Sequence, residues 1–214
     1  MDKRERVLAC MNHLPVDRPP VGFWFHFRED QKLGQACVQA HLDYYNHVDV
    51  DMVKIMCDGY FDYPNPLAQS VKTASDWYHL KPLGKDHPFI REQVERAKQV
   101  KAGLKDNMCV FYNVFAPFSS IRFGTSDEMV MEHFRQDPKA IASALSVIAE
   151  DNSTLCELLL TEAGCDGVYY CVQGGEKDRR HRLAKAAPAR QMSGDVPLQQ
   201  EGCPRRRVKN SHVH

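Results

Sequence analysis

Short apolar runs alternate with longer amphipathic stretches along most of the chain. The short runs predict strands that are buried on both faces. The longer stretches place apolar residues three or four positions apart, which predicts helices with one inward face. Strands are expected at residues 21–27, 52–57, 108–117 and 168–173. Helices are expected at residues 3–12, 33–47, 89–105, from 127 onward and 137–162.

The order of these elements indicates the fold class. Strands that alternate with helices form successive βα units, whose strands pair in a parallel sheet. The sequence contains neither G-x-G-x-x-G nor G-x-x-x-x-G-K, so no nucleotide-binding fingerprint favours a Rossmann fold. We therefore expect an α/β fold that is a partial (β/α)8 barrel, or TIM barrel. A whole barrel takes about 250 residues, so the expected strands correspond to its first four or so βα units.

Two of the expected helices carry polar residues that we place on the surface. His41 and His47 are expected on the outer side of the helix at residues 33–47. The helix at residues 89–105 has an apolar stripe and many charges, which is typical of a helix with one solvated face.

The stretch from Asp51 to Tyr60 carries the leading candidate for chemistry. Its apolar run ends abruptly in Cys57, Asp58 and Gly59. In α/β folds the groups that bind or react lie at the carboxyl ends of strands, and a glycine lets another group come close. Asp58 is therefore a candidate catalytic residue. The alternative is that Asp58 caps the turn that follows, as aspartate often does.

Polar residues also follow the other expected strands. His26 and Arg28 come at the end of the first strand, and Asn113 lies near the end of the third. Gln173 ends the fourth strand, and Glu176 follows it. Because the carboxyl ends of parallel strands share one edge of the sheet, these side chains are expected to line a common substrate-binding mouth. Each could instead cap a turn or make a structural hydrogen bond, and His26 could be a half-buried histidine whose hydrogen bonds are satisfied.

The formal net charge of zero hides a break in composition. Residues 177–214 hold ten Lys or Arg against three Asp or Glu and contain no Phe, Trp, Tyr or Ile. Such a segment cannot bury enough apolar surface to offset its ordering entropy. We expect a globular part at residues 1–176 and a basic tail at residues 177–214 that is disordered or frameshifted. We ascribe its Arg205–Arg207 run to an accident of the reading frame rather than to a binding site, so no nucleic-acid partner is expected.

The cysteines and the hydropathy bear on the compartment. The eight cysteines are scattered singly without a C-x-x-C pair, and several lie in apolar runs, where a thiol behaves as a small hydrophobe. This favours a reducing, cytoplasmic compartment over a disulfide framework. The sequence has no apolar run near the roughly 18 residues of a membrane span. No membrane partner and no bound metal are expected.

Four segments resemble the uroporphyrinogen decarboxylase (URO-D) family. They are R-E-R-V-L-A-C-M-N-H-L-P-V-D-R-P-P-V at residues 4–21, V-D-M-V-K-I-M-C-D-G at 50–59, N-V-F-A-P-F-S-S at 113–120 and A-G-C-D-G-V-Y-Y-C-V-Q-G-G-E at 163–176. The resemblance covers the N-terminal half of the family's barrel. It implies decarboxylation of the acetate side chains of a tetrapyrrole, uroporphyrinogen, in porphyrin and haem biosynthesis, without a cofactor. Asp58 falls on the family's central aspartate, which binds pyrrole N–H groups.

The chain departs from the family at several positions. The family's arginine-rich motif after the first strand is replaced by residues 23–29, where Arg28 is the one arginine. The family's active-site tyrosine falls on Phe123, which has no hydroxyl, and Gly174-Gly175-Glu176 replaces the usual segment after the fourth strand. A related branch transfers methyl groups between a methylated compound and a thiol or corrinoid partner with zinc. Its zinc ligands belong to the half of the barrel that lies outside this chain.

The tail does not resemble the family, which makes an inactive truncated fragment a third reading. A half-barrel exposes an unpaired edge strand and the inward side chains of its sheet. We therefore expect the isolated chain to be marginally stable, to aggregate, or to pair with another half-barrel as a homodimer.

Overall fold

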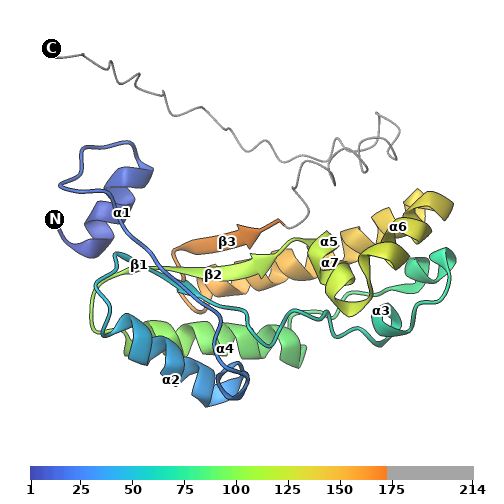
Figure 1. The fold of residues 1–214 in the computed structure, drawn as a ribbon, viewed down its shortest axis with the longest axis horizontal. Coiled ribbons are helices and arrows are strands. Elements are labelled where there is room, and N and C mark those ends of the chain that lie inside the picture. The colour runs from blue at the N-terminus through green and yellow to red at the C-terminus, as the bar shows by residue number, and fades with distance from the viewer. Residues whose placement is uncertain (173–214) are drawn as a thin grey trace, which may run out of the picture. The chain divides into compact units, whose positions relative to one another are not determined.

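A computed structural model describes residues 1–172 of the chain and shows an α/β fold (Figure 1). Its sheet has three parallel strands in the order β1 (Met52–Ile55), β2 (Cys109–Phe115) and β3 (Gly167–Cys171). Val53 of β1 lies opposite Val110, and Tyr112 of β2 lies opposite Val168. Strands that are consecutive in the sequence are thus neighbours in the sheet, as the prediction of successive βα units requires. Residues 1–172 do not close a barrel.

Helices make up most of the described chain outside the sheet. Their bounds are α1 Lys3–Met11, α2 Gly34–Tyr45, α3 Pro66–Ser70, α4 Pro88–Gly103, α5 Pro117–Gly124, α6 Asp127–Gln136 and α7 Pro138–Thr161, with short 3-10 helices η1 Glu29–Gln31 and η2 Ala74–His79. Two helices are capped by side chains at their first turn. Ser126 accepts a hydrogen bond from the Met129 N–H at the start of α6, and Asp137 accepts one from the Lys139 N–H at the start of α7.

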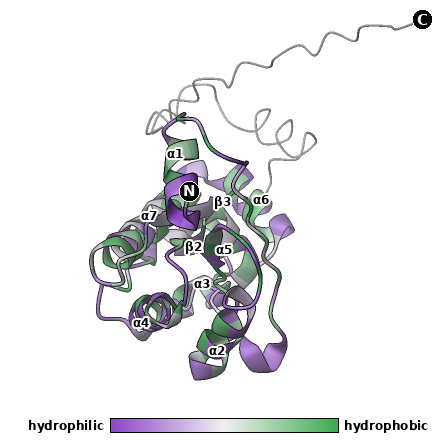
Figure 2. Ribbon diagram, turned by 90° about the vertical axis from the view of Figure 1, so that its left-hand side faces the viewer, coloured by the Kyte–Doolittle hydropathy of each residue, from purple (hydrophilic) through white to green (hydrophobic). Residues whose placement is uncertain are grey.

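One face of the sheet is covered by α2, α4 and α7. Val53 and Ile55 of β1 share a buried core with residues of these helices, such as Val94 of α4 and Leu159 of α7. Figure 2, turned by 90°, shows α2, α4 and α7 together on one side of β2. Because side chains alternate along a strand, Lys54 is directed to the other face of the sheet.

A second core anchors the long excursion between β1 and α4. Trp77 of η2 is fully buried, and its indole Nε1 donates a hydrogen bond to His133 Nδ1 of α6 at 3.0 Å. Asp151 of α7 accepts hydrogen bonds from the Tyr63 hydroxyl and from the Leu83 N–H. The excursion is therefore held against α6 and α7.

Asp51, at the amino end of β1, fastens the N-terminal segment to the sheet. Its carboxylate is fully buried and accepts hydrogen bonds from Arg6 Nη1 (2.5 Å), Arg18 Nη1 (2.5 Å) and the Val21 N–H (2.7 Å). Burial alone raises the pKa of this carboxyl, but the donors from Arg18, Val21 and Arg6 outweigh burial and hold the pKa below its usual value. This network ties α1 and the segment after it to β1.

The prediction of a strand at residues 21–27 is wrong. The segment lies beside β1, and the Asp51 N–H donates to the Val21 carbonyl at 2.7 Å, but no other backbone hydrogen bond joins the two among the described residues. Side chains bind this backbone instead, since the Phe27 N–H donates to Asp58 Oδ2 at 2.9 Å. The expected burial is not found either, because Phe23, Trp24 and Phe25 are exposed and Phe27 is the one buried residue of the segment.

Three local expectations also need correction. His41 is fully buried rather than exposed, whereas His47 is exposed as expected. Arg96 and Gln93 are buried in α4, on a helix expected to be solvated outside its apolar stripe. Pro117 starts α5 by occupying its first turn, where the strand expected at residues 108–117 was to end. The expectations for residues 177–214 lie outside the described residues.

Candidate functional site

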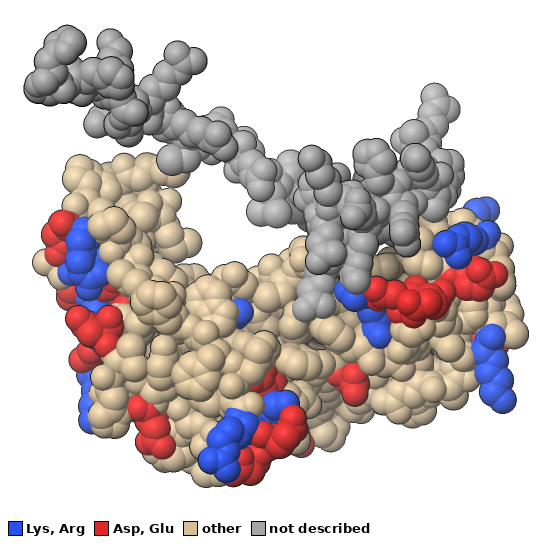
Figure 3. Space-filling view, viewed as in Figure 1, with Lys and Arg blue, Asp and Glu red and all other residues tan. Residues whose placement is uncertain are grey.

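A cavity of about 780 Å³ lies on the face of the sheet opposite α2, α4 and α7. Its wall is mainly aromatic, with Trp24, Phe61, Phe115, Phe123, Tyr169 and Tyr170. His26, Lys54 and Asn113 add polar groups. In Figure 3 the middle of the visible face carries few charged side chains, which gather toward its two ends and its lower edge. A concave, largely apolar site with a few polar groups is typical of a small-molecule site.

His26 and Asp58 form a hydrogen-bonded pair at this cavity. His26 Nδ1 lies 2.9 Å from Asp58 Oδ1, and Asp58 Oδ2 accepts the Phe27 N–H at 2.9 Å. A carboxylate acceptor favours the tautomer in which Nδ1 carries the hydrogen. Nε2 of His26 has no hydrogen-bond partner among residues 1–172, and the His26 side chain is 68% exposed.

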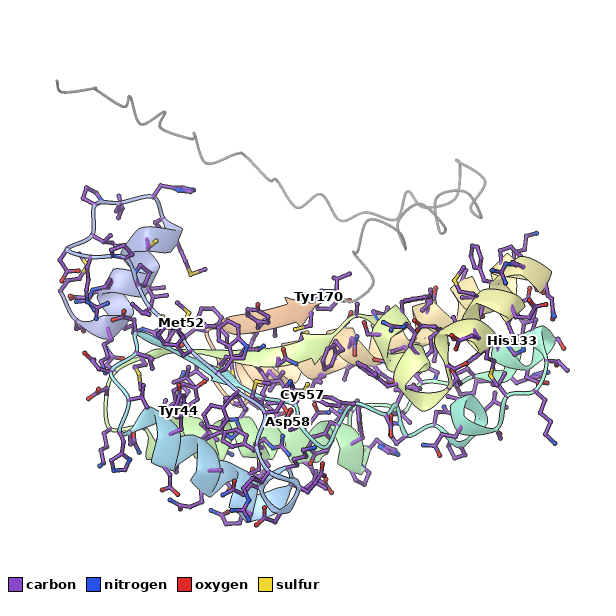
Figure 4. The ribbon with its side chains drawn as sticks, in the orientation of Figure 1. Tyr44, Met52, Cys57, Asp58, His133 and Tyr170 are labelled. Atoms are coloured by element: carbon purple, nitrogen blue, oxygen red, sulfur yellow. The ribbon has the colours of Figure 1, made fainter. Side chains whose placement is uncertain are left out.

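Asp58 itself does not line the cavity. Its side chain is fully buried, and Figure 4 shows Asp58 next to Cys57 between the sheet and α4. The Asp58 carboxylate therefore contacts the cavity through His26. The Asp58 carboxylate binds His26 and the Phe27 N–H rather than the turn that follows it, and its catalytic role stays a prediction.

Arg96 of α4 fixes the backbone behind this pair. Its Nη1 donates to the carbonyls of Met56 (3.1 Å) and Asp58 (3.2 Å), and its Nη2 donates to the Lys32 carbonyl (2.8 Å). The guanidinium also lies 4.5 Å from the centre of the Tyr60 ring. A buried guanidinium with these partners holds the chain rigidly where β1 ends.

Asn113 of β2 joins the ends of all three strands. Its Nδ2 donates to Cys57 Sγ at 2.7 Å, and its Oδ1 accepts from Cys171 Sγ at 2.9 Å. Burial raises the pKa of the Cys57 thiol to about 12 and raises the pKa of Cys171 as well. Both sulfurs are therefore protonated near neutral pH, which makes them poor nucleophiles.

Lys54 of β1 is the buried cation of the cavity. It is 6% exposed, and its Nζ lies 4.0 Å from the centre of the Tyr169 ring and 4.5 Å from that of Trp24. No carboxylate among the described residues forms an ion pair with it. The sequence held a signal for this residue, namely one lysine inside the apolar run of residues 52–57.

The remaining site candidates have different placements. Phe123 of α5 lines the cavity, and its ring centre lies 5.1 Å from that of Phe115. Arg28 is exposed, pairs with Asp30 at 3.2 Å and does not line the cavity. Gln173 and Glu176 lie outside the described residues.

The comparisons with known proteins give no family for this chain. No protein-family model, no curated protein and no solved structure matches it. Within residues 1–172 no three His, Cys, Asp or Glu side chains gather as a metal site. No helix of that part combines the length and apolarity needed to cross a bilayer.

Proposed function

We propose that the cavity is a decarboxylase site of the uroporphyrinogen decarboxylase type, which acts on a carboxylated small molecule without a cofactor. The observation that carries this proposal is the His26–Asp58 pair at the wall of a cavity lined by the carboxyl-terminal parts of the strands. The family resemblance supplies the reaction class, and the pair supplies a group that can move a proton.

Loss of a carboxyl group requires a proton at a defined place. The bond between the substrate carbon and its carboxylate breaks, CO2 leaves, and the electron pair stays with the substrate. A proton must then reach that carbon. His26 supplies it from Nε2, while Asp58 holds Nδ1 and stabilises the imidazolium that donates the proton.

The role of Asp58 in this proposal differs from the one the family resemblance implies. A fully buried carboxylate that already accepts from His26 and Phe27 has no open path to pyrrole N–H groups. Asp58 is therefore a positioning residue that acts through His26. The aromatic wall, including Phe123, suits packing against a flat ring such as a pyrrole.

The test is an activity assay of the whole 214-residue chain with uroporphyrinogen, which follows both CO2 and less carboxylated porphyrinogens. Replacing His26→Gln removes the proton donor, and we expect the rate to fall about 10²- to 10⁴-fold. His47→Gln is the matched control, because His47 is exposed just after α2 and does not line the cavity. Equal rates for the wild type and His26→Gln, or no decarboxylation by the wild type, would contradict the proposal.

A further inference from the structure

Lys54 differs from the other lysines of the described chain in its surroundings. It lies within β1, and only 6% of its surface is exposed. It nevertheless lines the cavity, where the rings of Trp24 and Tyr169 meet edge to face at 5.2 Å beside its amine. Lys3 and Lys32, by contrast, form ion pairs with carboxylates.

The surroundings of Lys54 favour its neutral amine more than water does. Burial removes solvent from the ammonium and lowers the pKa of Lys54, and the partly opposing influence of Cys171, Cys57 and Asp58 does not reverse the direction. A desolvated lysine in an apolar pocket is the environment that activates an amine as a nucleophile toward carbonyl groups. The two ring faces also suit a cation, so they would hold a positively charged iminium on the same nitrogen.

We propose that Lys54 forms an imine with the carbonyl group of a small oxo acid bound in the cavity. The geometry behind it is a buried amine without an ion-pair partner in residues 1–172, directed into a cavity that also contains His26. Loss of CO2 from the bound oxo acid rests on the proposed function. Formation of the imine does not.

The step balances without an oxidant or reductant. The Nζ lone pair forms a bond to the carbonyl carbon, and the carbonyl oxygen leaves as water with the two hydrogens of the neutral amine. Protonation of the imine nitrogen gives an iminium. In a 3-oxo acid the iminium accepts the electron pair released when the bond to the carboxylate breaks, so CO2 can leave without a metal or a cofactor. The product is an enamine, which takes a proton from His26 at the carbon that lost CO2 and becomes an iminium again. Water then hydrolyses this iminium to the ketone and frees Lys54.

Reductive trapping tests the imine directly. The whole chain is incubated with acetoacetate or, in parallel, with glyoxylate, and each mixture is treated with sodium borohydride, which delivers hydride to the imine carbon. Peptide mass spectrometry then measures the adduct at each lysine. We expect labelling at Lys54 to exceed labelling at exposed Lys98 and Lys105 severalfold, since burial lowers the pKa of Lys54 and so raises the neutral fraction of its amine.

The control is Lys54→Arg, which keeps the charge and the ring contacts but cannot form an imine. It should lose the adduct at residue 54 and keep the labelling of the exposed lysines, with its thermal unfolding recorded to show that it folds. Labelling of Lys54 no greater than that of Lys98 and Lys105 with both probes overturns the proposal. Trapping does not depend on turnover. A trapped Lys54 in a chain that releases no CO2 from uroporphyrinogen would reject the decarboxylase and keep the imine, and CO2 release from uroporphyrinogen without trapping would do the reverse.

Discussion

At the scale of single residues, burial decides what several side chains can do. His41 of α2 is fully buried, its Nδ1 donates to the Cys37 carbonyl at 2.7 Å, and its Nε2 accepts the Met56 N–H at 3.0 Å. One nitrogen must donate and the other must accept, so the ring is neutral. Burial lowers the pKa of His41 to about 4.

The buried His41 predicts that the protein loses stability in mild acid. The unfolded chain takes up a proton near the ordinary histidine pKa of about 6.5, while folded His41 resists it until about pH 4. The stabilisation is complete above pH 6.5 and is lost as the pH falls toward 4. Its size is about 3 kcal/mol in the free energy of unfolding.

Urea unfolding between pH 7.5 and pH 4.5 measures this contribution. Wild type and the exposed-site variant His47→Gln should show the same fall in the free energy of unfolding. His41→Phe should be less stable at pH 7.5 but should fall less steeply. Parallel pH profiles for wild type and His41→Phe would show that His41 is not the titrating group.

Arg96 and Arg91 offer a matched pair of arginines on α4. Arg96 is buried and bound to three carbonyl oxygens, whereas Arg91 is exposed and pairs with Glu162. Arg96→Met should lower the free energy of unfolding by about 3 kcal/mol, because it leaves buried carbonyls without donors. Arg91→Met should change it much less, as exposed ion pairs contribute little. Urea unfolding at pH 7.5 compares the two, and equal losses would contradict the role assigned to Arg96.

At the scale of elements, the hydropathy pattern predicted three of the four expected strands and the long helices to within a few residues. It failed at residues 21–27, where Phe23, Trp24 and Phe25 are exposed and the backbone does not pair as a strand. The choice between a ladder and an unpaired segment depended on Asp51 and Asp58, which bind the backbone at Val21 and Phe27. These partners are far from the segment in sequence, so no local pattern contains them.

The same limit applies to the candidate site. Parallel strands bring their carboxyl ends to one edge, so the sequence could predict that His26, Asn113 and the end of β1 lie near one cavity. It could not predict that His26 stands between Asp58 and the cavity. Nor could it predict the burial of Arg96, which looks like any other charge on an amphipathic helix. Both depend on which side chains fill the space between distant elements.

At the scale of the whole described molecule, large apolar side chains gather around one open face. Trp24, Tyr169, Tyr170 and Val172 are exposed by between 41% and 69%. β3 pairs with β2 and has no second partner strand within residues 1–172. Exposed aromatic groups beside an unpaired strand edge are typical of surfaces that associate with another chain.

We therefore predict that the chain self-associates in solution. Light scattering coupled to size-exclusion chromatography should give a mass above the 24.5 kDa of one chain, and the mass should fall on dilution. Tyr170→Lys, which places a charge on the open edge, should shift the equilibrium toward the monomer. Met11→Lys, an exposed apolar residue on α1, serves as the control. A monomeric wild type at all concentrations would contradict the prediction.

A hydrogen-bonded aspartate lies near each end of β1, Asp51 before the strand and Asp58 after it. The two aspartates should tolerate mutation differently. The Asp51 carboxylate accepts hydrogen bonds from two arginines and one backbone N–H. Substitutions of Asp51 should therefore reduce the yield of folded protein for any substrate. Asp58 shares its carboxylate with a histidine at an open cavity, so a different partner at position 26 changes what the cavity can do while much of the fold persists. The amino end of this strand therefore constrains how the sequence can diverge, and the carboxyl end is where divergence can produce a new specificity.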